Sequence, residues 1–216
     1  GKANAIDAVT SRIMGDIFAS FRDDPELRVA ILTGTGEKFF CPGWDLKAAA
    51  EGEPPDSDYG VGGFGGLQEL PDLNKPVICA VNGLAFGGGF EIMIACDIII
   101  AAEHATFALP EINSGTVADA ASIKLPRRIP YHVAMEMLLT GEFISGQRAY
   151  EIGLVNYLAP RAEVLARALE VARLLAGHPP TALRLTKERL REVTQAEFDD
   201  IEARLRSVLA DAENHL

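Results

Sequence analysis

The sequence lacks the features of several large protein classes. Its three cysteines, Cys41, Cys79 and Cys96, are an odd, scattered set without CxxC spacing, which argues against a disulfide framework and favours a reducing compartment. Basic residues are scarce: 20 Lys and Arg stand against 31 Asp and Glu, and the net charge of -11 argues against a nucleic-acid groove. Neither a bilayer-spanning apolar run nor an apolar signal core occurs. These absences predict a soluble cytoplasmic protein.

Several catalytic motifs are missing as well. Neither HExxH nor GxSxG occurs, and the 4 histidines have no metal-ligand spacing, so zinc hydrolysis and Ser-triad chemistry lack support and no metal is expected. No GK[ST] follows a glycine-rich turn, which argues against a P-loop. A GxGxxG pattern occurs at residues 60–65, but an acidic, Pro-rich segment precedes it where a dinucleotide-binding fold needs a strand. We interpret that pattern as a chance match.

What is present suits one fairly large globular domain, or a domain with an appended subdomain. The chain has 216 residues, 48% of them hydrophobic. Residues 27–34 and 75–83 are the clearest strands, and residues 96–111 are expected to hold two more. These segments are apolar on both faces, which is typical of a sheet covered by helices.

The rest of the chain predicts a lid and a helical end. Residues 48–74 are acidic and rich in Gly and Pro, and we expect a mobile surface loop leading into a short helix, a usual place for a ligand lid. After residue 122 apolar residues recur at helical spacing. Helices are predicted at residues 131–139, 145–152, 162–176, 181–193 and 196–212.

The stretch "NGLAFGGGFEI" places Gly87 to Gly89 inside an apolar run and Glu91 shortly after it. We predict that the glycines follow strand 75–83 and open a helix, whose first amides have no partner within the helix and carry the positive end of its dipole. Close helix packing alone is the alternative explanation for the glycines. Glu91, near the exposed amide of Gly88, favours a general acid or base beside an oxyanion site.

Two further carboxylates are candidates for the same pocket. Glu111, in "FALPEINSG", follows a predicted strand, so a strand end and a helix start are expected to converge there. Asp119, in "TVADAASIKL", is either a functional group or the N-cap of the helix it precedes, since Asp is a favoured cap.

The loop "EKFFCPGWDLKAAA" is a second candidate source of free amides. Its Pro-Gly turn is expected to leave the N–H groups of Trp44 and Asp45 unpaired, although such turns are common. Trp44, the only tryptophan, is alternatively a core residue. Cys41 is interpreted as structural, because no histidine lies near it in the sequence.

Taken in their order, "FCPGWDL", "NGLAFGGGFE" and "LPE" resemble the motifs of the crotonase (enoyl-CoA hydratase/isomerase) superfamily over essentially the whole chain. The stretch "KFFCPGWDLKAAAEGEPPDSDYGVGGFGGL", with Asp119 eight residues after Glu111, looks most similar to the carnitinyl-CoA dehydratase group within it. The resemblance implies an α/β crotonase fold, a ClpP-like spiral of ββα units with a C-terminal helical trimerisation region. Residues 1–121 would form the spiral core with the oxyanion-hole loops, and residues 122–216 a mainly helical region for oligomerisation and active-site cover.

The resemblance also implies the reaction and its residues. The backbone amides of Trp44 and Gly88 would form an oxyanion hole for a thioester carbonyl. Glu91 and Glu111 would handle the water and the α-proton in reversible hydration of an acyl-CoA, with Asp119 as a third catalytic candidate. No separate cofactor is implied, because coenzyme A is part of the substrate. Substrate and CoA contacts are expected from Arg28, Ala30, Lys38, Trp44, Asp45, Leu46, Lys47, Gly87 and Gly88.

Other expectations come from the same resemblance. A homotrimer or a dimer of trimers is expected, without nucleic acid or membrane as partner. A trimethylammonium group on the substrate would be met by an aromatic face or a carboxylate, with Asp119, Trp44, Tyr59 and Phe64 as candidates. Full-length relatives are expected to extend beyond both ends of these residues.

The run "GTVADAAS" departs from the glycine-rich pattern of many family hydratases and is expected to reshape the pocket wall. Because dienoyl-CoA isomerases carry an acidic residue at the position of Asp119, double-bond isomerisation stays open. General enoyl-CoA hydration is another alternative. A non-catalytic acyl-CoA or RNA binder is disfavoured by the two glutamates and the negative charge.

Overall fold

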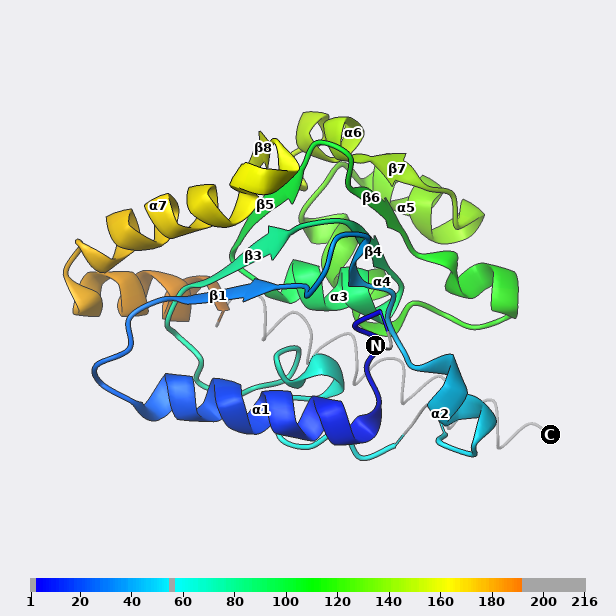
Figure 1. The fold of residues 1–216 in the computed structure, drawn as a ribbon, viewed down its shortest axis with the longest axis horizontal. Coiled ribbons are helices and arrows are strands. Elements are labelled where there is room, and N and C mark those ends of the chain that lie inside the picture. The colour runs from blue at the N-terminus through cyan, green and yellow to red at the C-terminus, as the bar shows by residue number, and fades with distance from the viewer. Residues whose placement is uncertain (1–2, 55–56, 192–216) are drawn as a thin grey trace.

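The computed structural model describes residues 3–54 and 57–191, and its chain repeats a strand-strand-helix unit (Figure 1). In each of the first three units, one strand enters a first sheet, the next strand enters a second sheet, and helical structure follows. The first sheet has the order β1-β3-β5-β8 and is parallel throughout. The second has the order β2-β4-β6-β7, in which only the β6–β7 pair is antiparallel. This alternation is the spiral of ββα units that the sequence predicts.

The bounds of the strands are β1 Ala30–Thr33, β2 Phe39–Cys41, β3 Val77–Val81, β4 Leu84–Phe86, β5 Ile98–Ala102, β6 Thr106–Ala108, β7 Ile144–Ser145 and β8 Tyr157–Ala159. The bounds of the α-helices are α1 Ala8–Asp23, α2 Leu46–Ala50, α3 Gly88–Ala95, α4 Asp119–Lys124, α5 Tyr131–Thr140, α6 Gly146–Glu151 and α7 Val164–Ala176. Short 3₁₀ turns are η1 Phe64–Gly66, η2 Pro110–Ser114, η3 Leu125–Arg127 and η4 Arg161–Glu163. Residues 180–191 are also helical.

The core lies around the first sheet. All five residues of β3 are fully buried, because this strand is central and helices cover its sheet. Helix α7 packs on β1, β3, β5 and β8 (Figure 1). The apolar strands predicted at residues 27–34, 75–83 and 96–111 are therefore confirmed as β1, β3, β5 and β6.

The sequence missed the strands of the second sheet. β2 and β4 have three residues each, too few to leave a periodic pattern. β4 lies between strand β3 and the glycines, so the predicted direct turn from strand 75–83 into the helix is wrong in that respect. The helix itself begins at Gly88, as expected.

The predicted lid is a surface loop only in part. Leu67, Leu70 and Leu73 are 7%, 2% and 3% exposed, so the second half of the 48–74 segment packs into the core. A 3₁₀ turn, η1, stands where a short helix was predicted. The GxGxxG pattern lies against α1, where Ser11 Oγ accepts a hydrogen bond from the Gly65 N–H at 3.0 Å, so these glycines serve backbone packing.

The helical end follows the prediction closely. Helices α5, α6 and α7 occupy the ranges predicted at residues 131–139, 145–152 and 162–176, and residues 180–191 match the fourth helix. The fifth, at residues 196–212, lies outside the described residues. β7 and β8 lie after residue 122 and add a strand to each sheet, and the division at residue 121 stays a prediction. Among the described residues, no helix combines the length and apolarity needed to span a bilayer.

Candidate active site

The glycine turn between β4 and α3 lets two backbone segments approach each other closely. Gly87 has φ +51°, a left-handed conformation that glycine adopts readily, and Gly88 begins α3. A side chain at Gly89 would collide with the backbone carbonyl of Cys41 at the end of β2. A Cβ at Gly43, where φ is +92°, would lie only 2.9 Å from the Gly88 nitrogen. The glycines therefore bring the 41–45 loop onto the start of α3.

Two backbone N–H groups meet at this contact without a partner. Residues 43–45 pair with Ile6, whose N–H donates to Gly43 O at 2.9 Å and whose carbonyl accepts from the Asp45 N–H at 2.9 Å. That pairing fixes the loop and leaves out the N–H of Trp44. Among the described residues neither the Trp44 nor the Gly88 N–H donates a hydrogen bond. Unpaired amides at a helix start can stabilise a developing negative charge.

Glu91 lies one turn into α3 and is 8% exposed. Its Oε1 accepts a hydrogen bond from the Ala121 N–H, in the first turn of α4, at 2.9 Å. The pKa of Glu91 is raised to about 7, mainly by burial and also by the charges of Glu111 and Asp119, while the Ala121 hydrogen bond and the charge of Lys124 act in the opposite direction. A carboxyl group with this pKa can accept or donate a proton at neutral pH.

Glu111 approaches the same point from the opposite side, within η2. A Cβ at Gly87 would lie 2.8 Å from Glu111 Oε1, so this carboxyl group contacts the glycine turn. Its Oε2 is buried and has no hydrogen-bond partner among the described residues. Burial raises the pKa of Glu111. An unpartnered buried carboxylate oxygen is costly unless a ligand supplies a proton.

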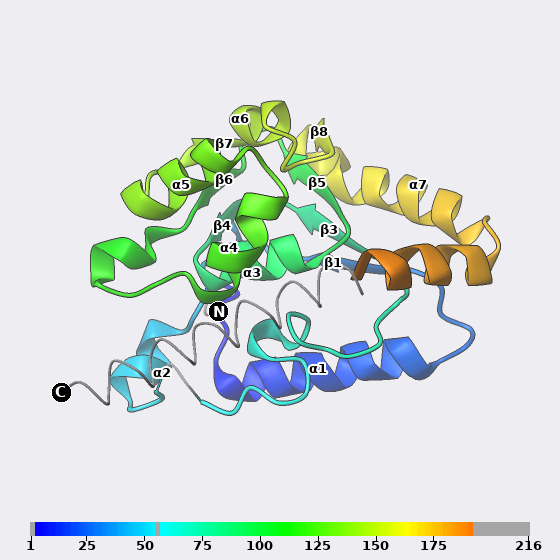
Figure 2. The same cartoon turned by 180° about the vertical axis from the view of Figure 1, so that it is seen from behind.

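Asp119 is the first residue of α4, while Ala118 is the N-cap and offers no side-chain hydrogen bond. The capping alternative for Asp119 is therefore wrong, because the helix begins at Asp119 itself, one residue earlier than that alternative requires. Glu91 instead satisfies an amide of the first turn of α4, and Figure 2 shows α4 beside α3. The Asp119 side chain instead lines the adjoining cavity.

A cavity of about 300 Å³ joins these groups. It brings together Glu91, Glu111, Asp119, Trp44 and Gly88, as the sequence predicts. Its remaining lining is mainly aromatic, acidic and small, and none of the described residues that line it is a Lys or Arg. The other lining residues are Tyr59, Phe64, Gln68, Glu69, Thr116, Val117, Ala118 and Ala120.

A family model described as enoyl-CoA hydratase/isomerase matches residues 1–212. The chain belongs to this family. Similar relatives include the carnitinyl-CoA dehydratases of Proteus mirabilis (strain HI4320) and Salmonella typhi, each 52% identical over 200 residues that cover 92% of this chain and 77% of the relative.

Solved structures of this enoyl-CoA hydratase/isomerase family agree with the fold. A carnitinyl-CoA dehydratase from Mycobacterium avium 104 is 38% identical, with a TM-score of 0.82 over 88% of this chain and 74% of that one. An enoyl-CoA hydratase from Mycobacterium marinum is 40% identical, with a TM-score of 0.81 over the same shares. The family and the fold class predicted from the sequence are thereby confirmed.

Three predicted CoA contacts, Asp45, Leu46 and Lys47, directly follow the cavity residue Trp44 in the sequence, at the start of α2. Asp45 caps this helix, its Oδ1 accepting from the Lys47 N–H at 3.0 Å. Leu46 is 77% exposed, and Lys47 Nζ lies 3.7 Å from Glu51 Oε1. Their contacts with CoA stay predictions.

Three other predicted contacts are not brought to the cavity. Arg28 donates a 2.6 Å hydrogen bond to the carbonyl of His178, and Ala30 is paired with β3 in the first sheet. Lys38 is exposed, with its amine 5.1 Å from the centre of the Phe39 ring. None of the three lines the cavity of the glutamates.

The structure adds Ala121 and Glu69 to the site, which sequence reasoning missed, and places Phe64 and Tyr59, already candidates from the sequence, on the cavity wall. The Ala121 amide holds Glu91, but a backbone donor has no sequence signature. Glu69 lines the cavity from the lid, where only its negative charge distinguished it. The Phe64 ring covers Gly88 so closely that a Cβ on the glycine would collide with it. Tyr59 packs edge-on to Phe64, with ring centres 5.3 Å apart.

Proposed function

We propose that this protein is a hydro-lyase that interconverts carnitinyl-CoA with crotonobetainyl-CoA and water. The observation that carries the proposal is one cavity in which two amides without a partner among the described residues adjoin the buried Glu91 and the half-buried Glu111, both with raised pKa values. Relatives at 52% identity that bear the name carnitinyl-CoA dehydratase support the same reaction.

The amides of Trp44 and Gly88 are proposed to bind the thioester oxygen. Removing the proton next to a thioester carbonyl places negative charge on that oxygen in the enolate. Donors already aimed at this charge stabilise it by several kcal/mol, because they need no reorganisation as the reaction proceeds. The tight contact of Gly43 with Gly88 keeps the two donors adjacent.

The two glutamates are proposed to divide the proton transfers. In dehydration, Glu111 would take the α-proton, and the electron pair of that C–H bond would form the enolate. The bond from the β-carbon to oxygen then breaks, and Glu91 would give its proton to the leaving hydroxyl to make water. Glu91 suits this role because a pKa of about 7 leaves a large protonated fraction at neutral pH. The unpartnered Oε2 of Glu111 suits the base.

The acyl preference is proposed from the charge of the cavity wall. A trimethylammonium group cannot donate hydrogen bonds, so it is attracted by aromatic faces and by carboxylates. Tyr59, Phe64 and Trp44 supply aromatic rings to this wall, while Glu69 and Asp119 supply charge beyond the two glutamates. Because no Lys or Arg occurs among the described lining residues, a cationic acyl group is favoured over the neutral crotonyl group.

Isomerisation of a dienoyl-CoA is a second candidate. The observation that favours it is Asp119 in the same cavity as Glu111, which gives a second pair for proton transfer. A cytoplasmic location, a homotrimer or dimer of trimers, and a reaction without a separate cofactor belong to the proposal as well.

The test is hydration turnover of the protein on crotonobetainyl-CoA beside crotonyl-CoA, followed by loss of the enoyl thioester absorbance. We expect a higher kcat/KM for crotonobetainyl-CoA. Preference for crotonyl-CoA would replace the assignment with a general enoyl-CoA hydratase. Turnover of neither, with a double-bond shift in a dienoyl-CoA, would favour the isomerase.

A further inference from the structure

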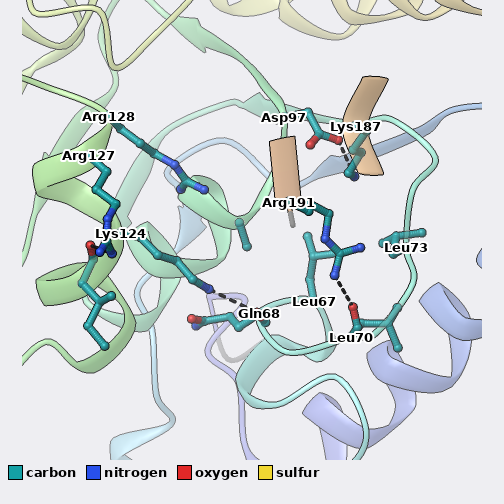
Figure 3. Close-up of a pocket in the computed structure, with 12 residues that line it drawn as sticks. Leu67, Gln68, Leu70, Leu73, Asp97, Lys124, Arg127, Arg128, Lys187 and Arg191 are labelled. Atoms are coloured by element: carbon teal, nitrogen blue, oxygen red, sulfur yellow. Dashed lines mark hydrogen bonds and ion pairs between the residues drawn. The ribbon is translucent and has the colours of Figure 1, made fainter. Parts of the chain in front are cut away.

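A second cavity lies near the other end of α4, with a volume of about 150 Å³ (Figure 3). Its wall carries five basic side chains and one carboxylate, in a chain whose net charge is -11. These charged residues are Lys124, Arg127, Arg128, Lys187, Arg191 and Asp97. The cavity shares Gln68 with the cavity of the glutamates. Its charge is nevertheless opposite, because no basic residue lines that first cavity within residues 3–54 and 57–191.

The cations come from separate parts of the fold, and all of them except Arg128 donate to backbone carbonyls. Lys124 Nζ, on α4, donates to Gln68 O at 3.1 Å, and an Arg191 N–H donates to Leu70 O at 3.0 Å. Lys187 Nζ donates to the carbonyl of Lys75 at 2.8 Å. Figure 3 shows Lys124, Arg128 and Arg191 extending into the space between these segments. Because these contacts fix the amine and guanidinium groups, the cavity is organised before any ligand enters.

The positive charge around this cavity is poorly compensated. Lys187 forms an ion pair with Asp97 at 2.6 Å, and Asp97 Oδ2 also accepts from the Val77 N–H at 2.7 Å. Among the described residues no carboxylate lies within ion-pair distance of Lys124, Arg128 or Arg191. Lys124 and Arg191 are half-buried, and a partly buried charge without counter-charge is unfavourable unless a partner is supplied, while the exposed Arg128 adds positive charge at the mouth of the cavity.

Lys124 shows the cost of this arrangement most directly. The pKa of its amine is lowered to about 8, mainly by burial and also by the charge of the nearby Arg128, while the charges of Glu91, Glu69 and Asp119 act in the opposite direction. A bound anion would favour the charged amine. Both the geometry of the cavity and its positive charge therefore favour a bound anion.

We propose that this cavity binds a small phosphate dianion, either free phosphate or the phosphate group of a phosphomonoester. Arg guanidinium forks match the geometry of phosphate oxygens, and Lys supplies further point charges. Cations from α4, η3 and residues 180–191 surround the space from different directions, which suits a tetrahedral anion better than a planar carboxylate. The volume is below the range typical of drug-sized ligands, so a small group is favoured.

The test is calorimetric titration of the whole chain with inorganic phosphate, without substrate and near neutral pH. We expect one phosphate per chain. Arg128→Met and Lys124→Met should each weaken phosphate binding roughly tenfold or more, the loss expected for a charge-assisted hydrogen bond. The Arg128 side chain forms no hydrogen bond within the described residues, and its backbone N–H, which donates to Leu125 O at 2.9 Å, is kept in the variant, so the replacement should leave the fold intact.

The matched control is Arg184→Met. Arg184 lies on the same helical stretch as Lys187 and Arg191, is exposed and pairs with Glu188, but does not line this cavity. Its replacement should change phosphate affinity by no more than about twofold. No phosphate binding by the wild type would overturn the proposal. So would equal weakening in all three variants, or wild-type affinity in both Arg128→Met and Lys124→Met.

A parallel titration with adenosine 3′,5′-bisphosphate distinguishes the two phosphate sources. Tighter binding of the bisphosphate, competing with inorganic phosphate and lost in Arg128→Met, would assign the site to a phosphomonoester. Binding of inorganic phosphate without competition from the bisphosphate would assign it to the free ion. Both results support the phosphate site, and neither depends on turnover.

Discussion

The two cavities that border Gln68 show how one short helix separates opposite charges. Asp119, the first residue of α4, lines the larger cavity with Glu91 and Glu111, while Lys124, its last residue, lines the smaller one. The peptide dipoles of a helix favour negative charge at its start and positive charge at its end. The larger cavity is therefore suited to a cationic acyl group and the smaller one to an anion.

Burial acts on both cavities with opposite signs. It raises the pKa of Glu91 to about 7 and lowers the pKa of Lys124 to about 8. Each group has a backbone hydrogen-bond partner and no close counter-charge: Glu91 accepts from Ala121, and Lys124 donates to Gln68. A full ion pair would hold each group in its charged form. Without an ion pair, the protonation states of Glu91 and Lys124 can both change when a ligand binds.

The largest expected effect tests whether catalysis belongs to the acidic cavity. Glu91→Gln and Glu111→Gln should each lower turnover of crotonobetainyl-CoA by roughly 10²- to 10⁴-fold, because a positioned acid or base contributes that much. Steady-state kinetics measure the loss. Glu103→Gln, on an exposed turn outside both cavities, is the control. Near wild-type turnover in both variants would move the chemistry elsewhere.

The second-largest expected effect tests the proposed oxyanion hole, which is formed by the uncharged backbone amides of Trp44 and Gly88. Gly43→Ala should lower kcat by roughly 10²- to 10³-fold, because its Cβ would press on the Gly88 nitrogen and displace an oxyanion donor. Gly36→Ala is the matched control, since Gly36 has φ +87° and open space around it.

Both variants place a Cβ at a positive φ, but only Gly43→Ala adds close contacts, with Gly88 N and Phe86 O, so its thermal unfolding should shift further than that of Gly36→Ala. The kcat values are therefore compared at a temperature at which both variants are folded. Equal kcat values for the two variants would argue against an oxyanion hole at this contact.

A third test measures how much the burial of the Glu91 carboxyl group lowers the free energy of unfolding as the pH rises. The folded pKa of about 7 exceeds the ordinary value of 4.5, so this group binds its proton more tightly in the native state. Its contribution to stability is full below about pH 4.5 and is lost as the pH rises through about 7.

Glu91→Gln removes that dependence. The free energy of unfolding of this variant minus that of the wild type should therefore increase by on the order of 3 kcal/mol from acid pH to a pH above neutral. This is the energy that corresponds to the shift in the pKa of Glu91. Urea unfolding at both ends of this range measures the gain, with Glu103→Gln as control. A constant difference across the range would mean that Glu91 is not strained by burial.

The smallest effect tests the proposed recognition of the ammonium group. Asp119 is exposed, so Asp119→Asn should reduce the preference for crotonobetainyl-CoA over crotonyl-CoA by roughly two- to fivefold, as an exposed ion pair permits. Turnover of crotonyl-CoA is the internal control. Equal loss on both substrates would instead assign Asp119 to proton transfer and favour the isomerase.

Much of the fold and site could be read from single residues. The strands of the first sheet are apolar on both faces, so β3 and β5 were visible, whereas β2 and β4 are too short for a period to show. Gly88 and Glu91 were recognised as site residues because three glycines and a carboxylate inside an apolar run lower the stability of the fold, which indicates a functional role.

The contacts of the lid and of α4 were not visible in the same way. The leucines of the lid looked like part of a surface loop because the surrounding Gly, Pro and acidic residues dominate its composition. The hydrogen bond from Ala121 to Glu91 joins residues thirty positions apart through a backbone donor, so no residue type marks it.

The sequence by itself determined the family, the spiral of strands and helices, and which carboxylates and amides are candidates for chemistry. Local pattern and residue type suffice for these, because apolar periodicity and glycine placement act over a few residues. Only the tertiary structure decided that Glu91 is buried with a pKa near neutral, that Glu111 faces it across the glycine turn, and that a basic cavity lies behind Gln68. Those features depend on which distant segments exclude water from one another, and that follows from packing of the whole chain.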